Sequence, residues 1–359
     1  MTIRFGIIGC GFISKRHLDA IAHCQNAKLV AVSDIQIERM NDAITYYKNA
    51  SNTHETIKQY TTYTDMVESE EVDAVVICTI SGLHAEMAKI SLIAGKHVIL
   101  EKPMTLSLKE ADDIIQLAKA KNLQLMICHQ MRFRPIMQKI KEVIDEGKIG
   151  RPYLGVASIR LNRSPEYYAG AAWRGDWGKD GGMLINQGIH VIDLLQWFLG
   201  DVKNVYGDIS RFSQTKETED IALGILTFAN QAKGIIEANI ITQPNNLGYH
   251  LSIYGEKGCI SIEGPSLNSI SRWFIKDEVT SLNELEQLTS DQNEQLYMYN
   301  NFIESIQTPN QQVLISGEEG KKALETIFAL YNSTLTGKSQ NLPLENFNTM
   351  NMKSKGGPT

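Results

Sequence analysis

The feature that most constrains the fold is a glycine-rich turn near the N-terminus. Residues 3–8 form an apolar, strand-like run, and GCGFIS (residues 9–14) follows directly and opens a helix. Glycines in this place let the backbone turn tightly and approach a pyrophosphate, while the free N–H groups of the helix attract its charge. An ordinary strand–turn–helix without a ligand is the alternative, and the motif ends in serine rather than glycine or alanine. The turn predicts a dinucleotide site that includes Gly9, Gly11, Phe12 and Ile13.

The second predicted strand helps to identify the nucleotide. Residues 28–33 are strand-like, and Asp34 stands at their end, 25 residues after Gly9. A carboxylate there can accept hydrogen bonds from both hydroxyls of the adenosine ribose, and it repels a 2′-phosphate. Residues 35–37 contain no lysine or arginine. We therefore expect NAD rather than NADP.

The order of strands and helices predicts two domains. Up to about residue 131, strands that are apolar throughout alternate with helix-length segments, which is typical of a parallel sheet covered on both faces. From about residue 152, several strands follow one another with turn signals between them, which indicates an antiparallel sheet. We predict an α/β protein with two domains and a loose tail over its last dozen residues. The domains are an N-terminal, doubly wound Rossmann domain with a parallel sheet at residues 1–130, and a C-terminal α/β domain with an open, mostly antiparallel sheet at residues 131–359.

Composition excludes several classes of function. The net charge is −6 without a long basic run, which argues against nucleic acid as a partner. The five cysteines are scattered and form no C-x-x-C pair, and no histidine or carboxylate cluster has metal-ligand spacing, so we expect no metal site. No apolar run approaches the roughly 18 residues of a membrane helix, and no signal peptide precedes the first strand. We expect a cytoplasmic protein without a membrane partner.

Lys102 is the first candidate for chemistry, because it follows the predicted strand at residues 97–100. Ligands of open α/β sheets bind at the carboxyl ends of the strands, and burial beside a nicotinium charge lowers the pKa of an ammonium group. Lys102 is thus suited to exchange a proton with a substrate hydroxyl, although a surface lysine at a strand end is the alternative. Side chains near the same strand ends complete the expected cofactor site: Thr79, Ser81, His84 and Glu101. Packing or helix-end hydrogen bonds would equally explain His84, and also His17 in the first helix.

A second candidate group lies on the predicted helix at residues 184–198. Asn186, His190 and Asp193 are spaced i, i+4 and i+7, so they project from one helical face. Asn186 can both donate and accept a hydrogen bond, and His190 can exchange a proton near neutral pH. Asp193 can fix the tautomer of His190, but we expect it to brace the helix. A histidine satisfied within the core is the alternative for His190.

A third group combines arginines with aromatic residues at 160–175. Guanidinium groups suit phosphate or carboxylate, and aromatic rings can stack on a base or a sugar. Arg160 and Arg163 face opposite ways in a regular strand, so at most one of them enters a given cleft. Scattered surface arginines are the alternative. The candidates are Arg160, Arg163 and Tyr168 for the substrate, and Trp173 and Arg174 for the cofactor.

Three motifs in this order resemble the Gfo/Idh/MocA oxidoreductases, the family of glucose–fructose oxidoreductase and inositol dehydrogenase. They are the glycine turn, GKHVILEKP (residues 95–103) and GGMLINQGIHVIDLLQW (residues 181–197), and the likeness covers essentially the whole chain. The resemblance implies an NAD(P)-binding Rossmann domain and a second domain whose open sheet packs against a partner's sheet in homodimers and homotetramers. It also implies that Lys102 and His190 are the catalytic pair, with Asn186 and Gln187 at the substrate.

Within the family, the segment around Asn186 is most similar to nucleotide-sugar 3-dehydrogenases. Many family members carry aspartate where this chain has Asn186, and an amide cannot accept a proton at neutral pH. The R-x-x-x-Y-Y and W-R-G segments upstream are shared with UDP-N-acetyl-2-amino-2-deoxyglucuronate 3-dehydrogenases of surface-polysaccharide and lipopolysaccharide biosynthesis. The resemblance implies NAD-dependent oxidation of the C3 hydroxyl of a UDP-sugar, with an aminotransferase acting on the 3-keto product.

Three alternatives stay open. UDP-N-acetylglucosamine or a free polyol such as inositol or glucose could be the substrate of the same chemistry. A non-catalytic, NAD-binding sensor on the same fold is the most distant alternative. The presence of both Lys102 and His190 argues against the sensor, because a binding module needs neither a proton donor nor a base.

Overall fold

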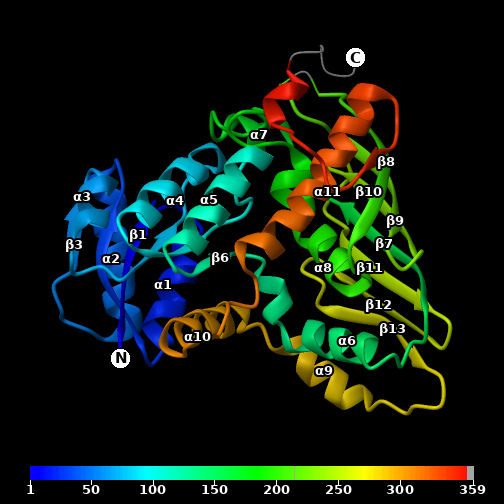
Figure 1. Cartoon of the computed structure of the whole chain (residues 1–359), viewed down its shortest axis with the longest axis horizontal. Coiled ribbons are helices and arrows are strands. Elements are labelled where there is room, and N and C mark those ends of the chain that lie inside the picture. Colours follow the sequence, from blue (N-terminus) through cyan, green and yellow to red (C-terminus); the bar gives the residue numbers. More distant parts are fainter. Residues whose placement is uncertain (214, 354–359) are drawn as a thin grey trace. The chain divides into compact units, whose positions relative to one another are not determined.

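The computed structural model describes residues 1–213 and 215–353, which form two compact units (Figure 1). Residues 130 and 131 fall in different units. Residues 293–320, which the sequence analysis places in the second domain, pack in the first unit. Unit 1 consists of residues 1–105, 109–130 and 293–320, and unit 2 consists of residues 106–108, 131–213, 215–292 and 321–353.

Unit 1 contains a six-stranded sheet in the order β3-β2-β1-β4-β5-β6, and every pair in it is parallel. This is the doubly wound Rossmann arrangement that the sequence predicts. Its strand order reverses between β1 and β4, and ligands of such sheets bind at the carboxyl ends of the strands beside that reversal. The strands are β1 (Ile3–Ile8), β2 (Ala27–Ser33), β3 (Lys58–Tyr60), β4 (Ala74–Ile77), β5 (His97–Leu100) and β6 (Leu125–Ile127).

The last helix of unit 1, α10, explains why residues 293–320 return to it. Tyr299 and Phe302 on this helix place their rings 5.4 and 6.2 Å from the ring of Phe5 in β1. These rings are fully buried, so their apolar area is removed from water. The helices of this unit are α1 (Ser14–His23), α2 (Ile37–Ser51), α3 (Tyr63–Glu68), α4 (His84–Ile93), α5 (Leu108–Ala120) and α10 (Glu294–Gln307), with a 3₁₀ turn η1 (Ser81–Leu83) before α4. The first residue of α5 belongs to unit 2.

Unit 2 contains an eight-stranded sheet in the order β13-β12-β11-β7-β10-β9-β8-β14. Only β10 and β7 pair in parallel, and the other neighbours are antiparallel, as the consecutive strands in the sequence predict. The strands are β7 (Pro152–Arg160), β8 (Val202–Ser210), β9 (Ile221–Phe228), β10 (Lys233–Asn239), β11 (Gly248–Gly255), β12 (Gly258–Gly264), β13 (Ser269–Ile275) and β14 (Gln340–Asn341).

The two faces of this sheet differ. One face is covered by α8 and α11 (Figure 1), and α8 lies so close that a Cβ on Gly155 of β7 would lie 2.4 Å from Leu195. Along β9 every second residue is buried toward the helices, whereas Leu223 and Ile225 between them are exposed. The helical elements of this unit are η2 (Gln130–Phe133), α6 (Pro135–Asp145), α7 (Pro165–Ala169), the π-helical turn η3 (Leu184–Gly188), α8 (Ile189–Leu199), α9 (Leu282–Ser290), α11 (Gly317–Thr336) and η4 (Thr349–Met352), of which η2 and α11 begin in residues of unit 1.

The expected loose tail is ordered over its first half. Asn348 caps the 3₁₀ turn η4, and Thr349 and Met352 are buried. Residues 354–359 of that tail lie outside the described residues. Among the residues that the structure describes, no helix is both long and apolar enough to cross a membrane.

Candidate functional site

The glycine turn of unit 1 has the geometry of a dinucleotide site. Gly9 has a φ of +91°, and a Cβ there would lie 2.8 Å from the carbonyl oxygen of Cys78, so only glycine fits between β1 and β4. A Cβ on Gly11, in contrast, would meet no atom within 4 Å. Helix α1 has no acidic residue in its first turn and no side-chain cap, so its N-terminal N–H groups remain suited to an anion. These residues fit the pyrophosphate of the expected cofactor.

The glycine turn helps to hold Asp34 in place. Its carboxylate accepts a hydrogen bond from the backbone N–H of Cys10 at 2.8 Å and another from Gln36 at 2.9 Å. The side chain is nearly buried at the end of β2. A carboxylate has about four lone-pair directions, so both oxygens can accept further hydrogen bonds from ribose hydroxyls. The position and the donor set fit NAD, as the sequence predicts.

We expect Asp34→Ala to weaken NAD⁺ binding by about 10-fold or more, because hydrogen bonds to a charged acceptor contribute roughly 1.5–3 kcal/mol. Isothermal titration with NAD⁺ and NADP⁺ measures the change. Asp34→Asn is the matched control, since it retains an acceptor but removes the charge that repels a 2′-phosphate. A variant that keeps both the affinity and the preference for NAD⁺ would contradict this role of Asp34.

Three expected cofactor residues lie after β4. His84 is buried, with Nδ1 at 2.7 Å from the carbonyl oxygen of Pro103 and Nε2 at 3.2 Å from that of Thr79. Burial lowers the pKa of His84. The imidazole of His84 therefore connects the end of β4 to the segment after Lys102. This contact matches the packing role that the sequence analysis gives as the alternative to cofactor binding. Ser81 begins η1 directly beside this connection.

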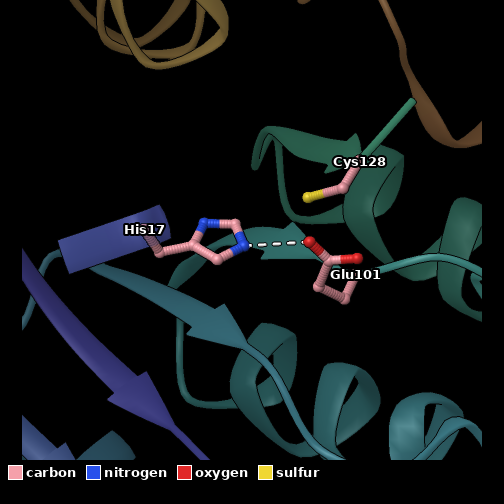
Figure 2. Close-up of side chains that lie close together, drawn as sticks. All are labelled: His17, Glu101 and Cys128. Atoms are coloured by element: carbon pink, nitrogen blue, oxygen red, sulfur yellow. Dashed lines mark hydrogen bonds and ion pairs between the residues drawn. The ribbon is translucent and has the colours of Figure 1, made fainter. Parts of the chain in front are cut away.

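A buried network fixes the backbone at Lys102. Figure 2 shows His17 of α1 pointing at Glu101, with Nε2 3.0 Å from Oε1, and the hydroxyl of Tyr299 lies 2.9 Å from Nδ1 of the same imidazole. The second oxygen of Glu101 accepts the backbone N–H of Lys102 at 3.1 Å. Burial alone would raise the pKa of Glu101, but the hydrogen bond from His17 and the neighbouring Lys102 lower it below its usual value. Glu101 is thus a buried carboxylate that orients the lysine segment.

Cys128 lies beside this network (Figure 2). Ligand atoms of His17, Glu101 and Cys128 all lie within 4.8 Å of one another, which is close enough for a shared metal ion. Burial and the charge of Glu101 raise the pKa of the Cys128 thiol well above its usual value. The contacts of His17 and Glu101 instead favour a hydrogen-bonding role.

In unit 2 the motif at residues 181–197 does not form one uniform α-helix. Asn186 and Gln187 lie in the π-helical turn η3, and α8 begins at Ile189, just before His190. The expected bracing role of Asp193 is confirmed, because it accepts hydrogen bonds of 2.8 and 2.7 Å from the buried guanidinium of Arg132. π-Helical turns within helices are frequent at functional sites. The turn carries the two polar residues that the sequence analysis assigns to the substrate.

Buried acids that the sequence analysis missed hold this turn. The carboxylate of Glu219 accepts hydrogen bonds from the backbone N–H of Leu184 at 2.9 Å and from the hydroxyl of Tyr331 at 2.6 Å. Burial raises the pKa of Glu219 to about 7, although the nearby Lys216 opposes this shift. Asp180 accepts a hydrogen bond from the side-chain amide of Asn186. No local motif in the sequence distinguishes these acids from polar loop residues.

The arginines and aromatic residues of the third group form a cluster within unit 2. The guanidinium carbons of Arg163 and Arg174 lie 5.2 and 4.2 Å from the ring centre of Tyr167, and Gln187 donates to its hydroxyl at 3.3 Å. The Nε atoms of both arginines and the Oε1 of Gln187 are buried and have no hydrogen-bond partner among the described residues. We call Arg163, Tyr167, Arg174 and Gln187 the arginine–tyrosine cluster.

The other members of that group differ in their environment. Arg160 forms a two-pronged ion pair with Glu237 of β10, with its shortest contact at 2.6 Å, so its charge is already neutralised. Tyr168 is buried, and its ring meets the ring of Tyr167 edge-on at 5.2 Å. Trp173 lies beside Arg174, at 5.5 Å from ring centre to guanidinium carbon. The structure therefore brings most of the group together and leaves Arg160 in an ion pair.

Comparison with known proteins identifies the family. Residues 3–129 match the oxidoreductase family with an NAD-binding Rossmann fold, and residues 137–261 match the GFO/IDH/MocA C-terminal domain. The chain is similar to the WlbA dehydrogenase of Bordetella pertussis, solved with NADH and UDP-GlcNAcA, at 32% identity and a TM-score of 0.85, covering 96% of this chain and 100% of that one. It is also similar to WlbA of Chromobacterium violaceum, solved with the same two ligands, at 29% identity and a TM-score of 0.87, over 96% and 97% of the two chains.

Among proteins compared by sequence, inositol 2-dehydrogenase of Salmonella typhimurium is 30% identical over 72% of this chain and 73% of its own length. The fold, the glycine turn with Asp34 and the full-length likeness agree with one another. The chain is a member of the Gfo/Idh/MocA oxidoreductase family, and its cofactor is NAD.

Proposed function

We propose that this protein oxidises the C3 hydroxyl of a UDP-sugar, UDP-N-acetyl-2-amino-2-deoxyglucuronate, to the 3-keto sugar. The observation that carries the proposal is the likeness over nearly the whole chain to WlbA dehydrogenases, whose structures hold NADH and UDP-GlcNAcA. The arginine–tyrosine cluster supports it. The guanidinium group of Arg163 suits a phosphate or the carboxylate of such a substrate, and that of Arg174 suits the pyrophosphate of the cofactor.

In the proposed reaction, Lys102 and His190 handle the proton of the C3 hydroxyl. One of them takes the proton, and the other donates a hydrogen bond to the oxygen as negative charge develops on it. NAD⁺, when bound, supplies the acceptor for the hydride from C3. Lys102 directly follows Glu101 of unit 1, and His190 lies in α8 of unit 2.

The remaining proposed contacts orient the sugar and the anion. Asn186 and Gln187 of the π-helical turn would bind hydroxyls of the hexose. Arg163 would bind the phosphate or carboxylate, and Tyr168, whose ring meets that of Tyr167, would also contribute to the substrate site. Arg160 would have to exchange Glu237 for the substrate, which makes it the weaker anion ligand of the two. Trp173 and Arg174 are proposed to bind the cofactor.

A polyol dehydrogenase is the second candidate. It is supported by the 30% identity to an inositol 2-dehydrogenase. A neutral polyol has the secondary hydroxyl that the reaction needs, but it offers no charge to the arginines. The two candidates therefore differ in whether Arg163 of the arginine–tyrosine cluster contributes to substrate binding.

The test is to mix protein of known NAD⁺ content with UDP-GlcNAcA, UDP-N-acetylglucosamine or myo-inositol and to follow the absorbance of reduced nicotinamide. A rise with the uronate alone supports the proposal. A rise with UDP-N-acetylglucosamine keeps the mechanism but changes the pathway, and a rise with inositol supports the polyol candidate. If none of the three compounds raises the absorbance of NAD⁺-loaded protein, the result contradicts the proposal and favours a sensor.

The product suggests the next enzyme. A 3-keto sugar is an electrophilic carbonyl compound, and an aminotransferase converts such a carbonyl into an amine. We therefore propose an aminotransferase as the pathway partner, in the synthesis of a surface polysaccharide.

We also propose self-association through the outer face of the eight-stranded sheet. Tyr206, Ile225 and Ile235 lie side by side on neighbouring strands β8, β9 and β10, and each is between 41% and 58% exposed. An exposed apolar row across adjacent strands is typical of a protein–protein interface.

Ile225→Glu should convert the oligomer to a monomer, because it places a charge in the middle of this row. Light scattering coupled to size-exclusion chromatography measures the mass. Val279→Glu changes an equally apolar but fully exposed residue outside the sheet and should leave the mass unchanged. A monomeric wild type, or an unchanged mass for Ile225→Glu, would contradict the proposal.

A further inference from the structure

Asn186 is held by a carboxylate from the loop that precedes its own helix. The side-chain nitrogen Nδ2 of Asn186 donates a hydrogen bond to Oδ1 of Asp180. A carboxylate can only accept hydrogen bonds, whereas an amide has a donor end and an acceptor end. The donor end of Asn186 therefore faces Asp180, and its carbonyl oxygen is turned away from that carboxylate.

The loop holds Asp180 firmly. Asp180 is 3% exposed, and its other oxygen accepts the backbone N–H of Gly175 at 2.8 Å. The carbonyl oxygen of Asp176 accepts the backbone N–H groups of both Asp180, at 2.9 Å, and Gly181, at 3.2 Å. Both carboxylate oxygens of Asp180 are therefore engaged, one by the backbone of Gly175 and the other by the side chain of Asn186.

The junction between this loop and the π-helical turn is equally constrained. Gly182 has a φ of +104°, and a Cβ there would lie 2.6 Å from both Oε2 of Glu219 and the hydroxyl of Tyr331. The backbone N–H of Asn186 donates to the carbonyl oxygen of Gly182 at 2.9 Å, and Glu219 binds the N–H of Leu184. Asp180 and Asn186 are thus joined by a short, tightly packed segment.

We infer that Asp180 is a positioning residue that fixes the amide orientation of Asn186, so that Asn186 presents its carbonyl oxygen to a hydroxyl group of the sugar. The inference deepens the proposed function, on which it rests. It assigns Asn186 the role of hydrogen-bond acceptor for a donor hydroxyl, rather than that of an acid or a base. It also explains why this position carries an amide, since a carboxylate at residue 186 would face the carboxylate of Asp180.

The surrounding charges strengthen this conclusion. Lys216, Glu219 and Asp220 are buried around the same loop, and Lys216 forms an ion pair with Asp220 at 3.0 Å. Burial lowers the pKa of Lys216, and the carboxylates of Glu219, Asp220 and Asp180 oppose that shift. The charge of Asp180 also helps to raise the pKa of two buried hydroxyl groups, those of Tyr168 and Tyr331. His190 follows Asn186 by about one helical turn. A further carboxylate at residue 186 would enter a site that already holds three acids.

A reciprocal exchange of the two residues tests the inference. In Asp180→Asn, the new amide keeps its oxygen toward Gly175 and turns its NH₂ toward Asn186, which must then flip and present a donor to the substrate. In Asn186→Asp, two carboxylates face each other. In the double exchange, the carboxylate introduced at position 186 accepts from the amide introduced at position 180 and again presents an oxygen outward. Asp176→Asn is the matched control, because Asp176 lies in the same loop but its side chain contacts Gly178 and Lys353 rather than Asn186.

We expect kcat/KM with UDP-GlcNAcA at pH 7.5 to fall about 10-fold in Asp180→Asn and about 100-fold in Asn186→Asp, from hydrogen bonds worth roughly 1.5–3 kcal/mol. Most of the loss should return in the double exchange, and Asp176→Asn should match the wild type. NAD⁺ affinity should stay constant throughout. If the free-energy losses of the two single variants, calculated from kcat/KM, simply add in the double exchange, the inference is overturned.

A readout that needs no turnover separates this inference from the proposed function. Facing carboxylates raise the pKa of one of them, so Asn186→Asp should lose thermal stability as the pH rises from 5 to 8, relative to the wild type. The double exchange should abolish that extra loss. If the wild type is inactive on the uronate but these stability profiles hold, the proposed function fails and the positioning contact stands. Parallel profiles for all four proteins would reject the contact itself.

Discussion

Lys102→Met is expected to abolish the reduction of bound NAD⁺ while leaving cofactor occupancy nearly unchanged. Methionine has a similar length and fills the same space, but it can neither donate nor accept a proton. General acid–base groups contribute about 10²–10⁴-fold to a rate, and loss of the hydrogen bond to the developing oxyanion adds to this. We expect kcat to fall by roughly 10³-fold or more. Stopped-flow absorbance of reduced nicotinamide in a single turnover measures the chemical step directly.

Two controls make this result specific to the side chain of Lys102. Lys89→Met changes an exposed lysine on α4 of the same unit and should leave the rate unchanged. NAD⁺ titration of Lys102→Met should give a Kd close to that of the wild type, because its backbone is held by Glu101 rather than by its own ammonium group. Normal turnover in Lys102→Met would remove this residue from the mechanism.

The largest effect on stability is expected from Glu101→Ala. This variant removes one partner of the buried His17–Glu101 pair and leaves the imidazole and the N–H of Lys102 without their acceptor. Breaking a buried pair in this way costs about 3–5 kcal/mol. All four tryptophans of the chain lie in unit 2, so tryptophan fluorescence follows that unit, whereas far-UV circular dichroism follows both. Chemical denaturation of Glu101→Ala, followed by circular dichroism, should therefore show a lower midpoint than the wild type. The shift should appear in the part of the signal that comes from unit 1.

The same pair predicts a pH dependence with a definite sign. The pKa of Glu101 is lowered in the folded protein, so its contribution to stability is fully present above the unfolded pKa of about 4.3. This contribution is lost as the pH falls through the lower, folded pKa. The stability difference between the wild type and Glu101→Gln should therefore be constant near neutral pH and shrink below about pH 4.

A matched variant and a double variant complete this experiment. Glu71→Ala removes an exposed glutamate that pairs with Lys58 and should change stability by less than about 1 kcal/mol. His17→Leu combined with Glu101→Leu should be less destabilising than the sum of the two single changes, because no buried polar group is then left without its partner. If Glu101→Ala and Glu71→Ala have the same stability, the buried pair does not hold unit 1 together.

Local features of the sequence, namely hydrophobic patterns, element order and turn signals, were enough to predict the two sheets. Strands that are apolar throughout, such as β4, can only be buried on both faces, so they require a parallel sheet between helices. Strict alternation in β9 requires one covered and one open face. These are local properties of the chain, and hence both sheets were predictable. Helix α10 was not assigned to unit 1, because its apolar face fits either domain until Phe5 is known to lie opposite Tyr299.

For the site, the sequence determined which residue types stand at the strand ends and in the glycine turn. Glycine is required at residue 9 because the backbone there lies close to the carbonyl oxygen of Cys78. Asp34 was recognisable from its place at the end of β2, where it binds the glycine turn. Asn186 was recognisable as a departure from the family pattern. The role of Asn186 could not be predicted, because its partner Asp180 lies in a loop whose path does not follow from any pattern in the sequence.

Only the tertiary structure decided which polar groups share a buried environment. Glu101 meets His17 across 84 residues of sequence, and Glu219 meets Tyr331 across 112. The pKa values and the orientation of such groups depend on burial and on partners that are distant along the chain. Sequence therefore determined the fold and the cofactor through local geometry, whereas the electrostatics of the site arose only when distant segments excluded water together.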